Sequence, residues 1–142
     1  MRIDFYLLTD PNPEAYWLMA CRLLEKAYHK QHRVFVYCNN QQEAENLDEL
    51  LWTFKPDSFI PHHLQTEGLE PPPPIQIGYE QEPRGFTDIL LNCSQIIPAF
   101  YERFQRVIQI VSANEADKLI SREHFRYFRQ RGLTPQTHTI EA

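Results

Sequence analysis

The chain is poor in the residues on which phosphate-binding sites depend. It has only four glycines in 142 residues, and the turn after its first apolar run, TDPNP, contains none of them. Dinucleotide-binding and P-loop turns need glycine there so that a phosphate can approach the backbone amides. The sequence therefore predicts no nucleotide site of these types and no bound cofactor.

Cysteines and long apolar segments are also scarce. The three cysteines, Cys21, Cys38 and Cys93, are far apart and none belongs to a CxxC pair, so we expect buried, reduced thiols. No apolar run approaches the roughly 18–20 residues that a membrane helix needs. The first residues, MRIDFYLLTD, do not resemble a signal peptide. We therefore expect a cytoplasmic protein without a membrane segment.

Recognisable catalytic groups are missing as well. His29 with His32, and His62 with His63, have no nearby cysteine or carboxylate to complete a metal set, and we expect the second pair in a turn. No serine lies in a GxSxG elbow. The sequence indicates no catalytic residue, no metal site and no enzymatic activity of this chain.

What the chain does contain is an alternation of apolar runs and amphipathic segments. Its 42% hydrophobic and 13% aromatic content fits a folded globule, and its length suits a single domain over residues 1–142. Short β-branched and aromatic runs predict strands, and apolar residues at three- and four-residue steps predict helices between them. This order favours an α/β fold with a Rossmann-like, mostly parallel sheet flanked by helices and lacking a nucleotide-binding loop.

The same patterns place the elements along the chain. The expected strands are residues 3–8, 33–37, a short edge strand at 75–79, 87–93, 106–111 and a small terminal strand at 136–140. The expected helices are residues 14–30, 39–51, a short helix at 97–104, and 112–131, which begins with a capping pattern at Ser112. The prolines at 71–74 predict a stiff connector, with a ligand for another domain as the alternative.

The last expected helix gathers cations in a chain whose formal net charge is −5. At about 100° per residue, one face carries Lys118, Arg122, Phe125, Arg126 and Arg129. The opposite, core-facing side is expected to carry Ile120, Tyr127 and Phe128. A solvated face is one interpretation. Because neighbouring like charges repel, the stripe also suits an acidic ligand with an apolar group, either single-stranded nucleic acid or an acidic peptide.

A second group of large apolar residues lies where a helix gives way to a loop: Trp52, Phe59, Ile60 and Pro61. Loops lie at the surface, so Phe59 and Ile60 either fold back over the sheet edge or contact a partner. Tryptophan and phenylalanine are typical anchors of protein interfaces. The residues alone leave both interpretations open.

Four segments in this order resemble one family along essentially the whole chain: DFYLL, RVFVYCNNQQEAENLDELLWTFKPDSFIPHHL, DILLNCS and REHFRYFRQRGL. They are similar to the chi subunit of bacterial DNA polymerase III, and the block LDELLW…SFIPH is the most specific part. The resemblance implies a noncatalytic accessory subunit of the clamp-loader assembly whose Rossmann-like fold has lost nucleotide binding. It also implies two partners, the psi subunit and the acidic C-terminal tail of single-stranded DNA-binding protein (SSB), so that the chain links the clamp loader to coated lagging-strand template.

The resemblance also assigns residues by position. It implies that the SSB tail binds Lys118, Arg122, Phe125, Arg126 and Arg129, where the family pattern has tyrosine in place of Phe125 and lysine in place of Arg126. It implies that psi, or a repair helicase in its place, contacts Trp52, Phe59, Ile60 and Pro61. We expect a monomer that forms a heterodimer with psi and meets DNA mostly indirectly. Direct binding of single-stranded nucleic acid by the last helix is the alternative.

Overall fold

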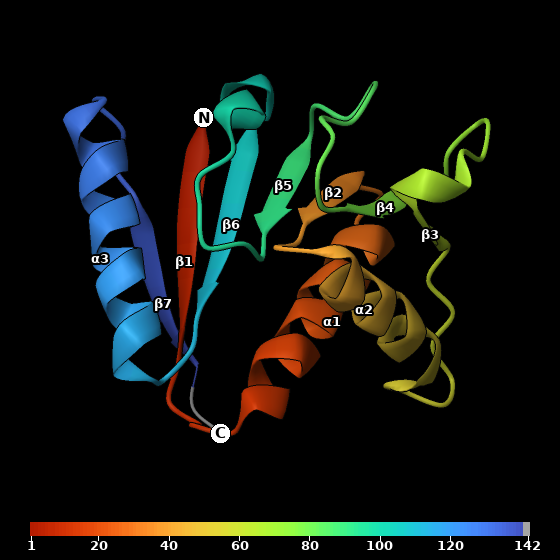
Figure 1. Ribbon diagram of the computed structural model, residues 1–142, viewed down its shortest axis with the longest axis horizontal. Helices are drawn as coiled ribbons and strands as arrows, with labels where there is room; N and C mark the ends of the chain where they lie inside the picture. The colour runs from red at the N-terminus through yellow and green to blue at the C-terminus, as the bar shows by residue number, and fades with distance from the viewer. Residues whose placement is uncertain (141–142) are drawn as a thin grey trace.

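One seven-stranded sheet organises the backbone in the computed structural model, which describes residues 1–140 (Figure 1). In chain order its strands are β1 (Arg2–Leu8), β2 (Val34–Tyr37), β3 (His62–Leu64), β4 (Ile75–Gly78), β5 (Ile89–Asn92), β6 (Arg106–Val111) and β7 (Gln136–Ile140). Across the sheet the order is β3-β4-β2-β5-β6-β1-β7, and all paired neighbours are parallel. The expected Rossmann-like α/β fold is confirmed.

Helices cover both faces of this sheet (Figure 1). The long helices are α1 (Pro13–His29), α2 (Gln41–Thr53) and α3 (Glu115–Gln130), and two short 3-10 helices are η1 (Gln65–Glu67) and η2 (Ala99–Arg103). Helices α1 and α2 pack on one face, and α3 packs on the other together with the segment around η2. Within residues 1–140, no helix combines the length and apolarity that a membrane crossing requires.

Asparagine side chains cap all three long helices. Asn12, Asn40 and Asn114 each accept a hydrogen bond from a backbone N–H in the first turn of α1, α2 and α3. The expected cap at Ser112 is wrong, because α3 begins after Asn114. Ser112 instead donates its hydroxyl hydrogen bond to the carboxylate of Asp117.

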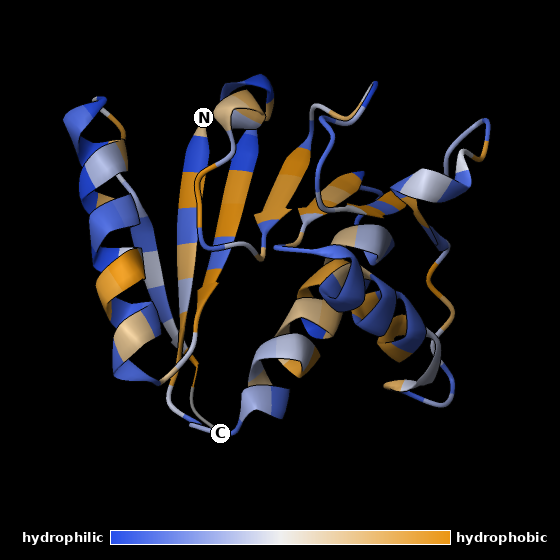
Figure 2. Ribbon diagram, viewed as in Figure 1, coloured by the Kyte–Doolittle hydropathy of each residue, from blue (hydrophilic) through white to orange (hydrophobic). Residues whose placement is uncertain are grey.

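Two apolar cores lie on the two faces of the sheet. The core under α1 and α2 includes Leu24 and Leu47, whereas the core under α3 includes Phe5, Phe35 and Phe128. Figure 2 shows the central strands mostly orange, as expected for strands covered on both faces. By contrast, α3 is mostly blue, and Phe128 is its one fully buried side chain. Helix α3 thus keeps an exposed side that can face solvent or a partner.

The sheet edge beyond β4 differs from the expectation. Residues 75–79 are not an edge strand, because β4 lies between β2 and β3 and is buried along its length. The edge is β3, which contains His62 and His63, so their expected place in a turn is wrong. Both imidazoles are buried, and His62 Nδ1 lies 2.6 Å from the Ile60 carbonyl oxygen. A strand of three residues with two histidines carries too little alternation to be recognised in the sequence.

A buried carboxylate ties together β1, β6 and β7. Asp4 is 0% exposed and accepts hydrogen bonds from Arg106 Nε and His138 Nε2, both at 2.8 Å, with Arg2 Nε at 2.9 Å. Burial raises the pKa of Asp4, but the hydrogen bonds from His138 and Arg106 and the charges of the two arginines outweigh it. The net effect lowers the pKa of Asp4 below its ordinary value.

We expect Asp4→Asn to destabilise the protein by about 3 kcal/mol at pH 7, because mostly buried Arg106 then lacks its counter-charge. Since the folded pKa is the lower one, the unfolded chain binds more protons as the pH falls below about 4, and wild-type stability declines there. Urea unfolding at pH 7 and between pH 5 and 3 measures both effects. The difference between wild type and Asp4→Asn should shrink on acidification, and a difference that stays constant would contradict this account.

Candidate protein-binding surfaces

Four cations and one aromatic ring lie together along α3. We call this group the α3 socket: Lys118, Arg122, Phe125, Arg126 and Arg129. The three arginines are exposed, whereas Lys118 is half-buried with its Nζ 3.5 Å from the Glu115 carboxylate. Among residues 1–140, none of these arginines forms an ion pair with a carboxylate. Their charges are therefore free to meet an acidic partner.

The core-facing side of α3 is rotated from the expected one. Phe128 is fully buried as expected, but Phe125 is half-buried too, with its ring centroid 5.5 Å from that of Phe5 in β1. Ile120 is half-buried and lines a polar pocket instead of the apolar core. Tyr127 is half-buried and packs against the core beside Tyr101 and Phe128, as expected. The expectation that Phe125 stands apart from the core is thus wrong, and its ring joins the socket to the core.

Phe125 lines two hollows in the surface. A hollow of ≈ 340 Å³ lies between α3 and strands β1 and β7, and its lining includes Phe5, Leu7, Lys118, Arg122, Phe125 and Thr137. A second hollow of ≈ 470 Å³ is lined by Arg122, Phe125, Arg126, Arg129 and Gln130. Arg122 borders both. An apolar recess and a cationic shelf therefore adjoin, as recognition of an acidic peptide with an apolar side chain requires.

We expect Phe125→Ala to lower the free energy of unfolding by about 2 kcal/mol, because the half-buried ring packs against the core. If an acidic peptide binds here, the same change should weaken its binding, because Phe125 lines both hollows. Phe125→Leu is the matched control, since it keeps most of the apolar contact. Thermal unfolding followed by peptide titration separates the two effects. A Phe125→Ala variant as stable as wild type would place the ring outside the core.

Two exposed aromatic rings lie near the opposite edge of the sheet. Trp52 at the end of α2 is 49% exposed, Phe59 in the following loop is 64% exposed, and their centroids are 5.7 Å apart. Trp52 also packs on His62 of β3 at 4.4 Å. Half-buried Pro61 follows in the same loop. We call Trp52, Phe59 and Pro61 the α2 aromatic surface.

Ile60 does not belong to this surface. It is 0% exposed and packs in the core under α2, so the expectation that its side chain contacts a partner is wrong. Its burial anchors the loop and leaves Phe59 outside. The loop is also fixed to α1, because Ser58 Oγ donates a 2.7 Å hydrogen bond to Glu25 Oε2. This bond lowers the pKa of Glu25, with a smaller contribution from Lys55.

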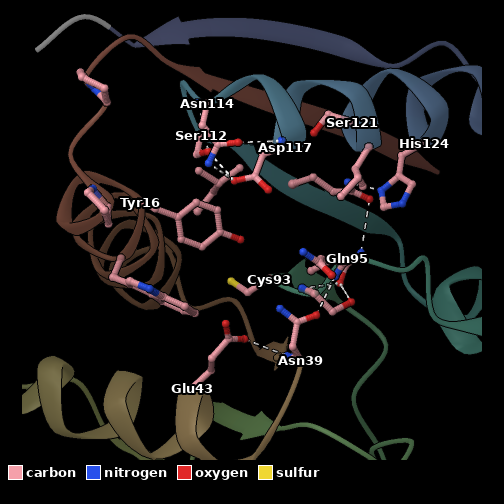
Figure 3. Close-up of a pocket in the computed structure, with 18 of the residues that line it drawn as sticks. Tyr16, Asn39, Glu43, Cys93, Gln95, Ser112, Asn114, Asp117, Ser121 and His124 are labelled. Carbon is pink, nitrogen blue, oxygen red and sulfur yellow. Dashed lines mark hydrogen bonds between the residues drawn. The ribbon is translucent and has the colours of Figure 1, made fainter.

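A polar pocket of ≈ 260 Å³ lies at the carboxyl ends of β1, β2, β5 and β6, where parallel α/β sheets usually bind ligands (Figure 3). Figure 3 shows Glu43 and Asp117 entering it from opposite sides. The Glu43 carboxylate accepts the Asn39 N–H at 3.0 Å, and the Asp117 carboxylate accepts from the side chains of Ser112 and Asn114. Because carboxylates occupy these donors, the pocket is unsuited to a phosphate.

Burial shifts the pKa values of two side chains in the polar pocket. Burial raises the pKa of the Cys93 thiol to about 12, so it is protonated near pH 7 and a poor nucleophile. Burial lowers the pKa of His124, whose Nδ1 accepts a 2.9 Å hydrogen bond from Gln109 Nε2. Within the described part of the chain, no three His, Cys, Asp or Glu side chains are placed to hold a metal ion. The polar groups that line the pocket hydrogen-bond mainly to one another.

The family model for "DNA polymerase III chi subunit, HolC" matches residues 1–136. The chain belongs to the chi-subunit family of DNA polymerase III. It is thus an accessory subunit of the replicase. The α3 socket and the α2 aromatic surface lie within the residues that the chi family model matches.

Three curated relatives share the name DNA polymerase III subunit chi. The protein of Pseudomonas aeruginosa is 34% identical over 139 residues, which are 98% of this chain and 96% of the relative. The protein of Haemophilus influenzae is 30% identical over 138 residues, 96% of each chain. The protein of Escherichia coli strain K12 is 28% identical over 140 residues, 95% of each chain. The similarity to chi subunits thus extends over almost the whole chain.

Sequence reasoning missed the residues that complete the recess beside α3. Leu7 and Thr137 form part of its walls, but they lie on β1 and β7 at opposite ends of the chain. The alternation of β1 does contain a signal, since Phe5 and Leu7 fall on the same face of a strand. Only the pairing of β7 with β1 brings Thr137 beside them.

Proposed function

We propose that this chi-family subunit binds the acidic C-terminal tail of SSB in the α3 socket. The observation that carries the proposal is a row of three arginines, Arg122, Arg126 and Arg129, that have no carboxylate partner within residues 1–140 and lie next to an apolar recess of ≈ 340 Å³. A peptide that ends in an apolar side chain and a free carboxylate matches both parts. The side chain fills the recess, and guanidinium groups hold the carboxylates in forked hydrogen bonds.

The two hollows suggest how the tail lies. Arg122 borders both hollows, so it is placed to hold the terminal carboxylate of a peptide whose last side chain fills the recess. Arg126 and Arg129 line the second hollow and meet the preceding acidic residues. Arg126 supports this better than a lysine would, since its planar fork binds a carboxylate through two hydrogen bonds.

We further propose that psi, or a repair helicase in its place, binds the α2 aromatic surface. Trp52 and Phe59 are among the most exposed large apolar side chains of the described residues and contact each other. The surface lies near β3, whereas the α3 socket lies near β7, at the other edge of the sheet. Six strand spacings of about 4.8 Å separate these edges by roughly 29 Å, which allows both partners to bind together.

In this function the chain is a connector without chemistry of its own. It joins the clamp loader, through psi, to SSB on the lagging-strand template, and polymerisation takes place in other subunits. The proposed state is a monomer when alone and a heterodimer with psi, working in the cytoplasm. Direct binding of nucleic acid is less well supported, because the Phe125 ring is half-buried beside Phe5, which leaves less of it accessible for base stacking.

Paired titrations test the function. The purified protein is titrated by fluorescence anisotropy with a labelled acidic peptide that ends in an apolar residue, and separately with labelled single-stranded oligothymidylate at the same salt concentration. We expect saturable binding of the peptide and much weaker binding of the oligonucleotide. A peptide with an amidated C-terminus is the matched control and should bind less tightly. Tight oligonucleotide binding without peptide binding would overturn the proposal in favour of direct nucleic-acid binding.

A further inference from the structure

One edge of the sheet is left open by β7. Within residues 1–140, β7 pairs only with β1, and the other side of β7 has no neighbouring strand. The Ile140 carbonyl accepts a hydrogen bond from the Thr9 N–H at 3.3 Å, so the backbone polar groups of Ile140 point toward β1. Because this direction alternates along a strand, Thr137 and Thr139 point their N–H and C=O groups outward. Both residues are exposed.

This edge also lacks the usual protection against strand addition. Natural edge strands are short, or carry charged residues or proline that discourage pairing. The opposite edge strand, β3, follows this rule with three residues preceded directly by Pro61. By contrast, β7 has five residues, QTHTI, with no Lys, Arg, Asp or Glu among them. The edge of β7 is therefore a ready template for another extended segment.

The open edge adjoins the α3 socket. Thr137 of β7 lines the apolar recess together with Lys118, Arg122 and Phe125 of α3. Figure 1 shows β7 running beside α3 at the border of the sheet. A peptide seated in the recess consequently has its main chain close to the unpaired groups of Thr137 and Thr139.

We infer that the acidic tail bound in the α3 socket adds to the sheet as an eighth strand beside β7. The inference rests on the proposed function and specifies how the tail is held: side chains by the socket, main chain by the edge. The positive charge of α3 favours an acidic peptide over a second copy of this chain as the added strand. A second copy of this chain would bring two arginine-rich α3 helices together, whereas an acidic segment is attracted by them. Main-chain pairing also tolerates varied residues in the tail, since it does not depend on side-chain identity.

A scan of backbone N-methylation on the peptide tests this pairing. Each variant keeps its side chains and terminal carboxylate but loses one N–H donor. Strand addition predicts alternation: methylation of inward-facing amides weakens binding about fivefold or more, and methylation of the amides between them has little effect. If the unmodified peptide binds but the losses are absent or do not alternate, the inference is wrong and the proposed function stands. If the unmodified peptide does not bind, the proposed function itself fails.

A pair of substitutions tests the edge from the protein side. Thr139→Pro removes an outward N–H that the sheet does not use and obstructs a new strand, while the fold tolerates proline at such an edge position. We expect peptide affinity to fall at least tenfold in Thr139→Pro and to change less than twofold in the control Thr139→Val. Equal affinities of the two variants would overturn the inference.

Amide hydrogen exchange of the wild-type protein gives a measure that does not depend on the folding of a variant. The Thr137 and Thr139 amides should exchange several-fold more slowly when the peptide is bound, and unchanged exchange would count against pairing. Light scattering of the peptide-free protein tests the other occupant. We expect a monomer, and a dimer whose formation protects the same two amides would assign the edge to a second copy of the chain.

Discussion

Replacing Arg122 with alanine is expected to weaken the binding of an acidic SSB-like tail peptide by about tenfold to a hundredfold. Arg122 borders both hollows of the α3 socket and has no carboxylate partner within residues 1–140. A hydrogen bond to a charged group contributes about 1.5–3 kcal/mol, which corresponds to this range. Because the side chain is exposed, its removal should leave the free energy of unfolding nearly unchanged.

Anisotropy titration of the labelled peptide measures this effect, and α3 provides a matched control. Arg131 directly follows α3, but its guanidinium carbon lies 3.5 Å from the centroid of the Tyr127 ring. Arg131→Ala changes the net charge equally and should weaken binding less than twofold. Arg122→Lys should lie between wild type and Arg122→Ala, since it keeps the charge and loses the fork. Equal losses in Arg122→Ala and Arg131→Ala would indicate unspecific attraction rather than a socket.

The parts of the fold that the sequence predicts well are those with strong periodic signals. The run RVIQIV was expected as a strand at residues 106–111, and β6 spans those residues because they are buried on both faces. The amphipathic pattern behind α1 places that helix within one residue at each end. The phase of α3 was harder to predict. Its polar surface includes Leu119, which is 58% exposed, and only Phe128 is fully buried, so the apolar positions define no clear stripe.

The candidate surfaces show the same limit: residue type can be read from the sequence, but tertiary placement cannot. Residue type and position identified Trp52, Phe59, Ile60 and Pro61 as candidates for an interface, because large apolar side chains at a helix end and in a surface loop either fold back or contact a partner. They could not show that Ile60 is the one turned into the core. That choice depends on where β3 adds to the sheet, and this tertiary contact has no local signal. The recess beside α3 was equally hidden, since its walls come from both ends of the chain.

The polar pocket shows how the helix N-termini at this edge of the sheet are satisfied without a phosphate ligand. The positive ends of α1, α2 and α3 all face the carboxyl edge of the sheet, where an anion would normally sit. Here the Asn12, Asn40 and Asn114 side chains accept from the first-turn amides. The carboxylates of Glu43 and Asp117 add negative charge at the same place. The chain thus completes its helix ends with its own side chains and needs no nucleotide for that purpose.

Phe59→Ala is expected to abolish co-purification with psi. Truncating an aromatic anchor at the centre of an interface commonly costs 2 kcal/mol or more, which weakens binding about thirtyfold or further. Phe59 is 64% exposed and is held by contact with Trp52, so little ordering is needed on binding. Co-expression of tagged psi with each variant, followed by pull-down, measures the effect. Retention of psi at wild-type levels would place its binding site elsewhere.

Two controls separate loss of the anchor from other causes. Ile96→Ala removes an apolar side chain that is 58% exposed in the loop after β5, and it should retain psi. Ser58→Ala keeps the Phe59 ring but breaks the hydrogen bond to Glu25 that fixes the loop, so it should weaken psi binding only several-fold. Ser58→Thr keeps a hydroxyl at this position and should retain most of the psi binding. Because the α3 socket lies near the other edge of the sheet, Phe59→Ala should bind the acidic peptide like wild type. Simultaneous loss of both partners would mean that the two surfaces are coupled or that the variant is misfolded, and a thermal melt of Phe59→Ala distinguishes these outcomes.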